Sequence, residues 1–266
     1  MGLATKHVES WLRQSFPFVA ALMPDAAASE ADAAGLAPLH YGVGDIHGMR
    51  AELDRLLDMI ETDAKAQGQP KTLVFLGDLV NRGPASRQVI DRLIEGPRQV
   101  GHRWIVLRGN HDQMFLDAVA GKSEAAFDEL MRKGGAETLA SYGLRKKDAS
   151  LARARRAVPA EHLRFLENLP FSYASGKYFF VHAGVDPDRP LDGQCAKTMM
   201  TIREPFLRKA HRLPCTVVHG HVPNPKGPTV APGRIGVDTG AHTSGILTAV
   251  ALCGEAEPRF LATLRK

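Results

Sequence analysis

Short, unbroken apolar runs recur along the chain from residue 40 onward, with polar segments of helical spacing between them. The runs Leu73–Leu76 and Trp104–Leu107 contain no polar residue, which is typical of strands buried on both faces. One helix is expected before Leu73–Leu76, with the buried stripe Leu53, Leu56, Leu57, Ile60. A second is expected between the two runs, starting at Pro84 with the stripe Val89, Ile90, Leu93, Ile94. This alternation predicts a βαβαβ unit and a largely parallel sheet in an α/β fold.

Each strand-like run is followed by residues that can bind a metal ion. Two later runs, Phe179–Val181 and Cys215–Val218, have the same apolar character as the earlier ones. The segments at the run ends are Gly44–Gly48, Gly77–Gly83, Gly109–Asp112, Val181–Gly184 and His219–His221. Because ligands of such sheets gather beyond the carboxyl ends of the strands, these segments are expected to converge on one site.

Residues 113–170 have a helical pattern instead and are expected to form a helical insert beside the site. The predicted helices are Met114–Val119, Ala125–Met131 and Glu161–Leu169, with Gly134, Gly135 and Pro159 as breaks. The insert holds the most basic part of the chain, around residues 145–156. These charges form either a solvated helix face or a rim that attracts phosphorylated substrates. Residues 1–38 are alanine-rich and form a flexible or docked extension, which leaves 39–266 as one domain.

Composition excludes several classes of protein. The chain has 34 basic and 29 acidic residues, a net charge of +5, and its basic residues are mostly dispersed. This mild excess favours anionic substrates without indicating nucleic acid. There are three cysteines and no CxxC pair, so we expect a cytoplasmic protein without a disulfide scaffold. No run approaches the roughly 20 apolar residues of a membrane span, and no membrane partner is expected.

The residues at the strand ends suit a pair of divalent cations. Their hard oxygen and imidazole nitrogen donors fit ions such as Mn, Fe or Zn. Asp78 is the natural carboxylate to bridge two ions, Asn110 adds a neutral oxygen, and His182 and His221 complete the second ion. Two adjacent divalent ions are the usual means of attacking a phosphoryl group with water.

Three further residues suit phosphate chemistry. Arg82 lies four residues after Asp78 and can grip phosphate oxygens, and Arg203 is a second candidate for that role. His111 directly follows Asn110 and is the expected proton donor to the leaving group, with Asp112 expected to orient its ring.

Residues 39–250 resemble the calcineurin-like metallophosphoesterases, and most of all the phosphoprotein phosphatase family with its bacterial and bacteriophage lambda members. That family carries GDxHG, GDxVDRG, GNHE or GNHD, a histidine after a strand, and GHT, in this order. The resemblance implies that Asp45, His47 and Asp78 hold one metal and that Asp78, Asn110, His182 and His221 hold the other. It also implies His111 as proton donor, Arg82, Arg203 and Asn110 as substrate contacts, and a four-layer αββα sandwich.

Several positions depart from the phosphatase pattern. Asn81 replaces an aspartate that supports groups near the site in the family. The GNHD form, with Asp112, and the pair Gly83-Pro84 are typical of the related diadenosine tetraphosphate hydrolases, but their GHW triplet is absent. Pro223 stands where nucleases and lipid pyrophosphatases of the superfamily have a second histidine, so nuclease activity is not expected.

The leading functional hypothesis from the sequence is a serine/threonine protein phosphatase that acts by attack of a dimetal-bridged hydroxide. Its partners would be phosphorylated proteins or small phosphoesters. The alternative is a dinucleoside polyphosphate hydrolase, and a third hypothesis is an inactive phosphoprotein-binding module. His219 is either a core histidine or a neighbour of the site, and His242 is expected on a surface loop. The sequence does not indicate an oligomeric state.

Overall fold

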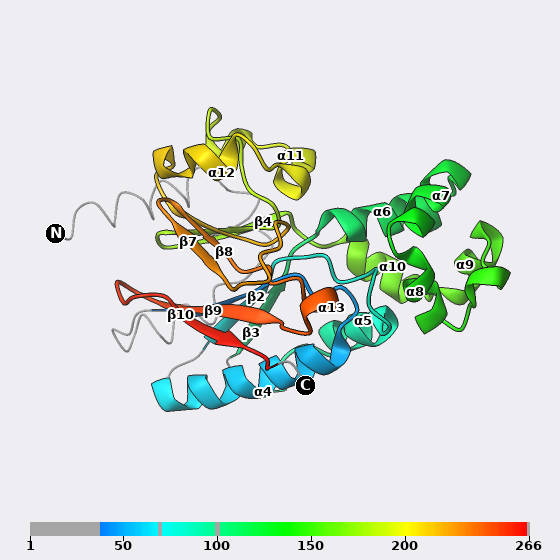
Figure 1. Cartoon of the computed structure of the whole chain (residues 1–266), viewed down its shortest axis with the longest axis horizontal. Coiled ribbons are helices and arrows are strands. Elements are labelled where there is room, and N and C mark those ends of the chain that lie inside the picture. Colours follow the sequence, from blue (N-terminus) through cyan, green and yellow to red (C-terminus); the bar gives the residue numbers. More distant parts are fainter. Residues whose placement is uncertain (1–37, 69–70, 99–101, 265–266) are drawn as a thin grey trace.

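Two mixed β-sheets lie face to face in the computed structural model, which describes residues 38–68, 71–98 and 102–264 (Figure 1). The extension expected over residues 1–38 lies outside this part of the chain except for its last residue. The first sheet has the strand order β10-β9-β1-β2-β3 and the second has the order β4-β5-β6-β8-β7. Helices cover the outer faces, so the four-layer αββα sandwich that the sequence implies is confirmed.

The first sheet contains the predicted βαβαβ unit. Its strands β1 (Leu39–Val43), β2 (Lys71–Phe75) and β3 (Arg103–Val106) are parallel. Near the end of the chain, β9 (Thr248–Cys253) runs antiparallel to β1, and the edge strand β10 (Arg259–Ala262) runs antiparallel to β9. The sheet is therefore mixed, whereas the βαβαβ pattern alone suggests a parallel one.

The connecting helices pack on the outer face of this sheet. Helix α4 (Arg50–Gln67) buries the predicted stripe of leucines and ends at Gly68, which adopts the left-handed conformation and donates its N–H to Ala64 and Lys65. Helix α5 (Ser86–Glu95) buries Val89, Ile90 and Leu93, but it begins two residues later than the predicted start at Pro84.

The second sheet holds β5 (Tyr178–Val181), β6 (Thr216–His219) and β8 (Arg234–Gly236) as parallel strands. Its antiparallel edges are β4 (Ser172–Ser175) and β7 (Thr229–Ala231). Short helices α11 (Ala196–Thr201) and α12 (Phe206–Lys209) lie on its outer side (Figure 1). The remaining short turns are η1 (Lys146–Asp148), η2 (Leu191–Gly193), η3 (Ala210–Arg212) and α13 (Ala241–Ser244).

The core between the sheets is mainly apolar, with Val74 and Leu76 from one sheet packed with Phe180, Val218 and Ile235 of the other. Gly42 lies where the sheets approach closely, since a Cβ there would come within 3.0 Å of Val218. Both sheets are therefore held in a fixed relation, and the ends of their parallel strands face one common region.

Five α-helices occupy residues 110–167, beside the end of the sandwich (Figure 1). Three match the predicted segments, namely α6 (Asn110–Val119), α7 (Glu124–Arg132) and α10 (Ala160–Glu167). Two more, α8 (Gly135–Ser141) and α9 (Leu151–Ala157), were not predicted, because seven residues are too few to show a helical stripe. Among the helices of the described residues, none combines the length and apolarity needed to cross a bilayer.

Candidate metal centre

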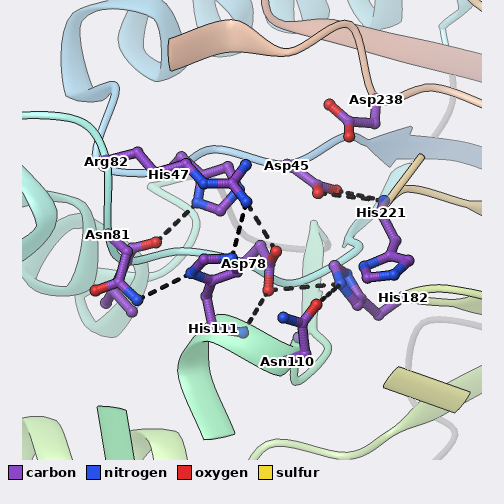
Figure 2. Close-up of polar contacts among 12 residues, drawn as sticks. Asp45, His47, Asp78, Asn81, Arg82, Asn110, His111, His182, His221 and Asp238 are labelled. Carbon is purple, nitrogen blue, oxygen red and sulfur yellow. Dashed lines mark hydrogen bonds and ion pairs between the residues drawn. The ribbon is translucent and has the colours of Figure 1, made fainter. Parts of the chain in front are cut away.

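The predicted motif loops meet at one end of the sandwich, where the parallel strands of both sheets stop (Figure 2). The local backbone is unusual there. Of the six non-glycine residues with positive φ in the described part of the chain, five lie in these loops: His47, Asp78, Asn81, Arg82 and His221. Such conformations cost roughly 1–3 kcal/mol each and persist where the surrounding structure enforces them, often at functional sites.

Glycines allow the loops to approach the carboxylates. A Cβ at Gly109 would collide with Asp78 Oδ1, and a Cβ at Gly220 would collide with Asp45 Oδ1. The glycines of these motifs therefore serve close backbone approach to the acidic side chains.

Asp78 is central to the site, as the sequence predicts. Its Oδ2 lies 3.5 Å from His47 Nε2 and its Oδ1 lies 3.5 Å from His182 Nε2. Two groups of possible metal ligands share this residue, one with His47 and His111 and one with His182 and His221, and the ligand atoms within each group lie within 4.8 Å of one another. A single carboxylate thus presents one oxygen to each of two adjacent positions.

The second nitrogen of each histidine is fixed by the backbone. His47 Nδ1 lies 2.9 Å from the carbonyl oxygen of Val80, and His182 Nδ1 lies 2.8 Å from that of Leu76. An imidazole that donates from Nδ1 to a carbonyl keeps its lone pair on Nε2, which is the arrangement found around metal-binding histidines. Asn110 Oδ1 lies 3.1 Å from His182 Nε2, beside the same position.

Asp45, which the sequence predicts as a ligand beside His47 and Asp78, belongs to neither of these two groups. Its carboxylate accepts from the backbone N–H of His221 at 3.1 and 3.2 Å. It also faces Asp238, a buried residue that sequence reasoning missed (Figure 2). Asp238 follows strand β8 within two residues, so it has the same position after an apolar run as the other acids, and this signal could have identified it.

Electrostatics in the site favour bound cations. Burial raises the pKa of the Asp45 carboxyl, and the neighbouring Asp238 and Asp78 raise it further. Burial also raises the pKa of Asp78, whereas it lowers the pKa of His182 to about 4. Neutral imidazoles and crowded buried carboxylates are what a divalent cation requires of its ligands, so the donor set fits a pair of such ions.

The surroundings of His111 differ from the sequence prediction. Asp112 does not contact its ring, because the Asp112 carboxylate accepts from the backbone N–H groups of Leu79 and Gly109 at 2.9 Å. The Asn81 side-chain amide instead lies 2.9 Å from His111 Nδ1. The prediction that Asp112 orients the histidine is therefore wrong: as the third residue of α6, Asp112 caps that helix, while Asn81 reaches the ring from the loop after β2.

The hydrogen bonds around His111 constrain its tautomer. Arg82 Nη2 lies 2.9 Å from Nε2, and a guanidinium can only donate, so Nε2 accepts and the neutral ring carries its proton on Nδ1. That proton needs an acceptor, which the Asn81 amide supplies when its oxygen faces the ring and its nitrogen faces Thr138 Oγ1, 3.0 Å from the other end of the amide. Thr138 also accepts from the Asn81 backbone N–H, so helix α8 holds this loop in place.

Replacing Asn81 by Ala is expected to lower kcat for phosphoester hydrolysis by about tenfold, because His111 loses the partner of Nδ1. Asn81→Asp should retain most of the activity, since a carboxylate oxygen can accept from the same N–H. Steady-state kinetics of the three proteins, alongside their melting temperatures, checks this. Equal activity of Asn81→Ala and the unaltered protein would show that the amide does not position His111.

Two arginines near the site have side chains that could bind an anion. Within the described residues, neither Arg82 nor Arg203 has a carboxylate within ion-pair distance. Arg82 lies beside His111, and Arg203, exposed between α11 and α12, exerts its charge on His221 and Asp238. The structure thus brings both predicted phosphate contacts to the same site.

Two other histidines have defined places. His219 is buried, with its ring centroid 5.2 Å from that of Phe206 and its Nδ1 2.9 Å from the carbonyl oxygen of Gly220, so it is a core histidine that also adjoins the site. His242 was expected on a loop surface, and this is wrong: it lies half-buried in α13, with its ring centroid 5.1 Å from that of His47. No periodicity could show this contact, because it depends on how the β8–β9 connection folds over the site.

Comparison with known proteins agrees with this geometry. Residues 41–245 match the family model described as calcineurin-like phosphoesterase. A symmetrical bis(5'-nucleosyl)-tetraphosphatase of Methylococcus capsulatus is 33% identical over 147 residues, which are 55% of this chain and 43% of that protein. The asymmetrical bis(5'-nucleosyl)-tetraphosphatase PrpE of Anoxybacillus flavithermus is 26% identical over 230 residues, 78% of this chain and 88% of that protein.

A solved structure assigned as a diadenosine tetraphosphatase superposes with a TM-score of 0.60 at 26% identity, covering 86% of this chain and 96% of the other. Against the symmetrical tetraphosphatases, the chain spans about half of their length.

These relatives overturn the leading hypothesis of a serine/threonine protein phosphatase. The curated relatives are named as tetraphosphatases, whereas a solved serine/threonine phosphatase from Saccharomyces cerevisiae is only 15% identical at a TM-score of 0.54, which shows a shared fold alone. The sequence already contained the opposing signal in the GNHD motif and in Gly83-Pro84. The missing GHW triplet is the feature that favours the phosphatase reading of the sequence.

Proposed function

We propose that this chain, which belongs to the calcineurin-like phosphoesterase family, hydrolyses a phosphoanhydride bond of a dinucleoside tetraphosphate. The observation that carries the hydrolase chemistry is the position of Asp78, with one oxygen toward each of two adjacent ligand groups. The names of the relatives support the substrate class.

The donors suit two divalent ions of the Mn, Fe or Zn type. Asp45, His47 and Asp78 would hold one ion, and Asp78, Asn110, His182 and His221 would hold the other. When bound, such a pair polarises a phosphoryl group and provides a nucleophile from water near neutral pH.

The remaining residues bind the substrate and move its proton. Arg82 and Arg203 would grip the oxygens of the attacked phosphate from two sides. A phosphate bound in this way draws the Arg82 guanidinium away from His111 Nε2, which frees that nitrogen to carry a proton to the leaving oxygen. Asn81 keeps the ring in the required orientation, and Thr138 of α8 supports Asn81.

A substrate comparison tests this function. Protein loaded with Mn²⁺ is incubated with diadenosine tetraphosphate and, separately, with a phosphoserine peptide, and products are separated by chromatography. We expect kcat/KM for the tetraphosphate to exceed that for the peptide on the order of 100-fold. Two ADP molecules would identify symmetrical cleavage, and ATP with AMP would identify asymmetrical cleavage.

Comparable rates on the two substrates would contradict the proposal. Metal-loaded protein that turns over no tetraphosphate, peptide or aryl phosphate would instead indicate a binding module without catalysis. Protein treated with EDTA serves as the control for contaminating metal-independent phosphatases.

A further inference from the structure

The turn between α7 and α8 lies directly against the phosphate-binding loop. The backbone N–H of Arg82 donates to the carbonyl oxygen of Gly134 at 3.0 Å. Gly134 has φ of 93°, and a Cβ there would come within 2.8 Å of the Arg82 nitrogen. This approach requires glycine, and it places the preceding residue, Lys133, next to the loop that carries Arg82.

The charge of Lys133 is only weakly neutralised. Its nearest carboxylate is Glu129, with Nζ 4.0 Å from Oε1, while Arg132 binds the same side chain at 2.6 Å. The Lys133 side chain is 54% exposed, so it is free to reorient. Arg82, whose backbone binds Gly134, also places Nη2 2.9 Å from His111 Nε2, so the turn that carries Lys133 borders the His111 side of the site.

Arg203 and Lys133 are basic residues that approach the site from two different parts of the chain. Arg203 lies between α11 and α12, whereas Lys133 directly precedes Gly134, whose carbonyl oxygen accepts from the backbone N–H of Arg82. In the proposed mechanism, His111 faces the leaving group. Lys133, one residue from the backbone contact with Arg82 and with an exposed side chain, would therefore border a leaving group that faces His111.

The charge that the leaving group gains determines how strongly a cation beside it stabilises the reaction. When water attacks an anhydride, a new bond forms between its oxygen and the attacked phosphorus, and the bridging P–O bond breaks. The electron pair of that bond leaves with the departing nucleotide, whose terminal phosphate gains one negative charge. A phosphoserine releases an alcohol once the oxygen is protonated, so it gains nothing from a nearby ammonium.

We propose that Lys133 is a specificity-determining residue that binds the terminal phosphate of the departing nucleotide. This inference rests on the proposed function and adds to it the residue that recognises the departing phosphate.

The test compares Lys133→Met with Lys147→Met, which removes the same charge from an exposed position in η1 of the same helical region. For Lys133→Met, the ratio of kcat/KM on diadenosine tetraphosphate to that on phenyl phosphate should fall about tenfold. Lys147→Met should leave this ratio unchanged, and Lys133→Arg should restore most of it. Calorimetric titration with ADP and with inorganic phosphate gives a second readout, in which Lys133→Met weakens ADP binding more than phosphate binding.

An equal fall on both substrates, an equal effect of Lys147→Met, or unchanged ADP affinity would overturn the assignment. Failure of the proposed function appears differently, as an unaltered protein that does not cleave the tetraphosphate. In that case, weaker ADP binding by Lys133→Met would still support a nucleotide phosphate contact at Lys133, and unchanged binding would count against it.

Discussion

Asp78→Asn is expected to remove both metal ions from the protein and to abolish most of its hydrolytic activity. Asp78 presents Oδ2 toward His47 and Oδ1 toward His182, so both ligand groups depend on its negative charge. Loss of a residue that merely supports a ligand costs roughly 10–100-fold in metal affinity or activity, and loss of a shared ligand should exceed that range. Elemental analysis of the purified protein and kinetics on the same preparation measure both effects.

The asparagine variant should remain folded, because its side-chain oxygen can still accept from the backbone N–H of His111, which donates to Asp78 at 2.8 Å. Asp117→Asn is the matched control: it makes the same change at an exposed position of α6, and both ions and activity should be retained. Full metal content in Asp78→Asn, with an unchanged melting temperature, would show that Asp78 does not bridge the two ions.

His111→Asn is expected to slow hydrolysis by about 10²–10⁴-fold when the leaving group is a poor one, such as the phenol of phenyl phosphate. The loss should be much smaller for p-nitrophenyl phosphate, because p-nitrophenolate departs without a proton. The dependence of rate on the acidity of the leaving phenol, measured over a series of aryl phosphates, is therefore steeper in the variant.

His111 also belongs to the group of His47 and Asp78, whose nitrogen and oxygen atoms could hold an ion together. Metal content separates the two roles. A proton donor can be replaced without loss of metal, so both ions should remain in His111→Asn. A drop of one ion per chain, with equal losses on both aryl phosphates, would identify His111 as a ligand instead.

The candidate ligands could be identified from the sequence because a short local pattern of residues marks each of them. A strand end and a tight loop are specified by an apolar run that is followed within a few residues by a glycine and a carboxylate or histidine. Gly77-Asp78 after β2 is an example. The order of helices and strands then implies that these ends share one edge of a sheet. Asp78, His182 and His221 were predicted together for this reason, and the structure places them together.

The partners of these residues could not be found in this way. Asn81 rather than Asp112 contacts His111, Asp238 faces Asp45, and His242 packs on His47. Each contact joins loops from separate strands, and a rotation of one loop would exchange one partner for another without changing any hydrophobic pattern. Gly134 is a further example. The sequence predicts only a helix break at this residue, and the packing of α8 shows that it supports Arg82.

The sequence by itself thus predicted the kind of site, a cluster of metal-ligand residues at the ends of parallel strands in a chain of the calcineurin-like phosphoesterase family. Apolar runs and glycines fix local backbone conformation, and this is enough to place the ligands. Only the tertiary structure decided which side chains contact His111 and which basic residues lie near the site. Those contacts depend on distances between loops far apart in the chain, which are set by the packing of two sheets and of helices α6 to α8 rather than by any local pattern.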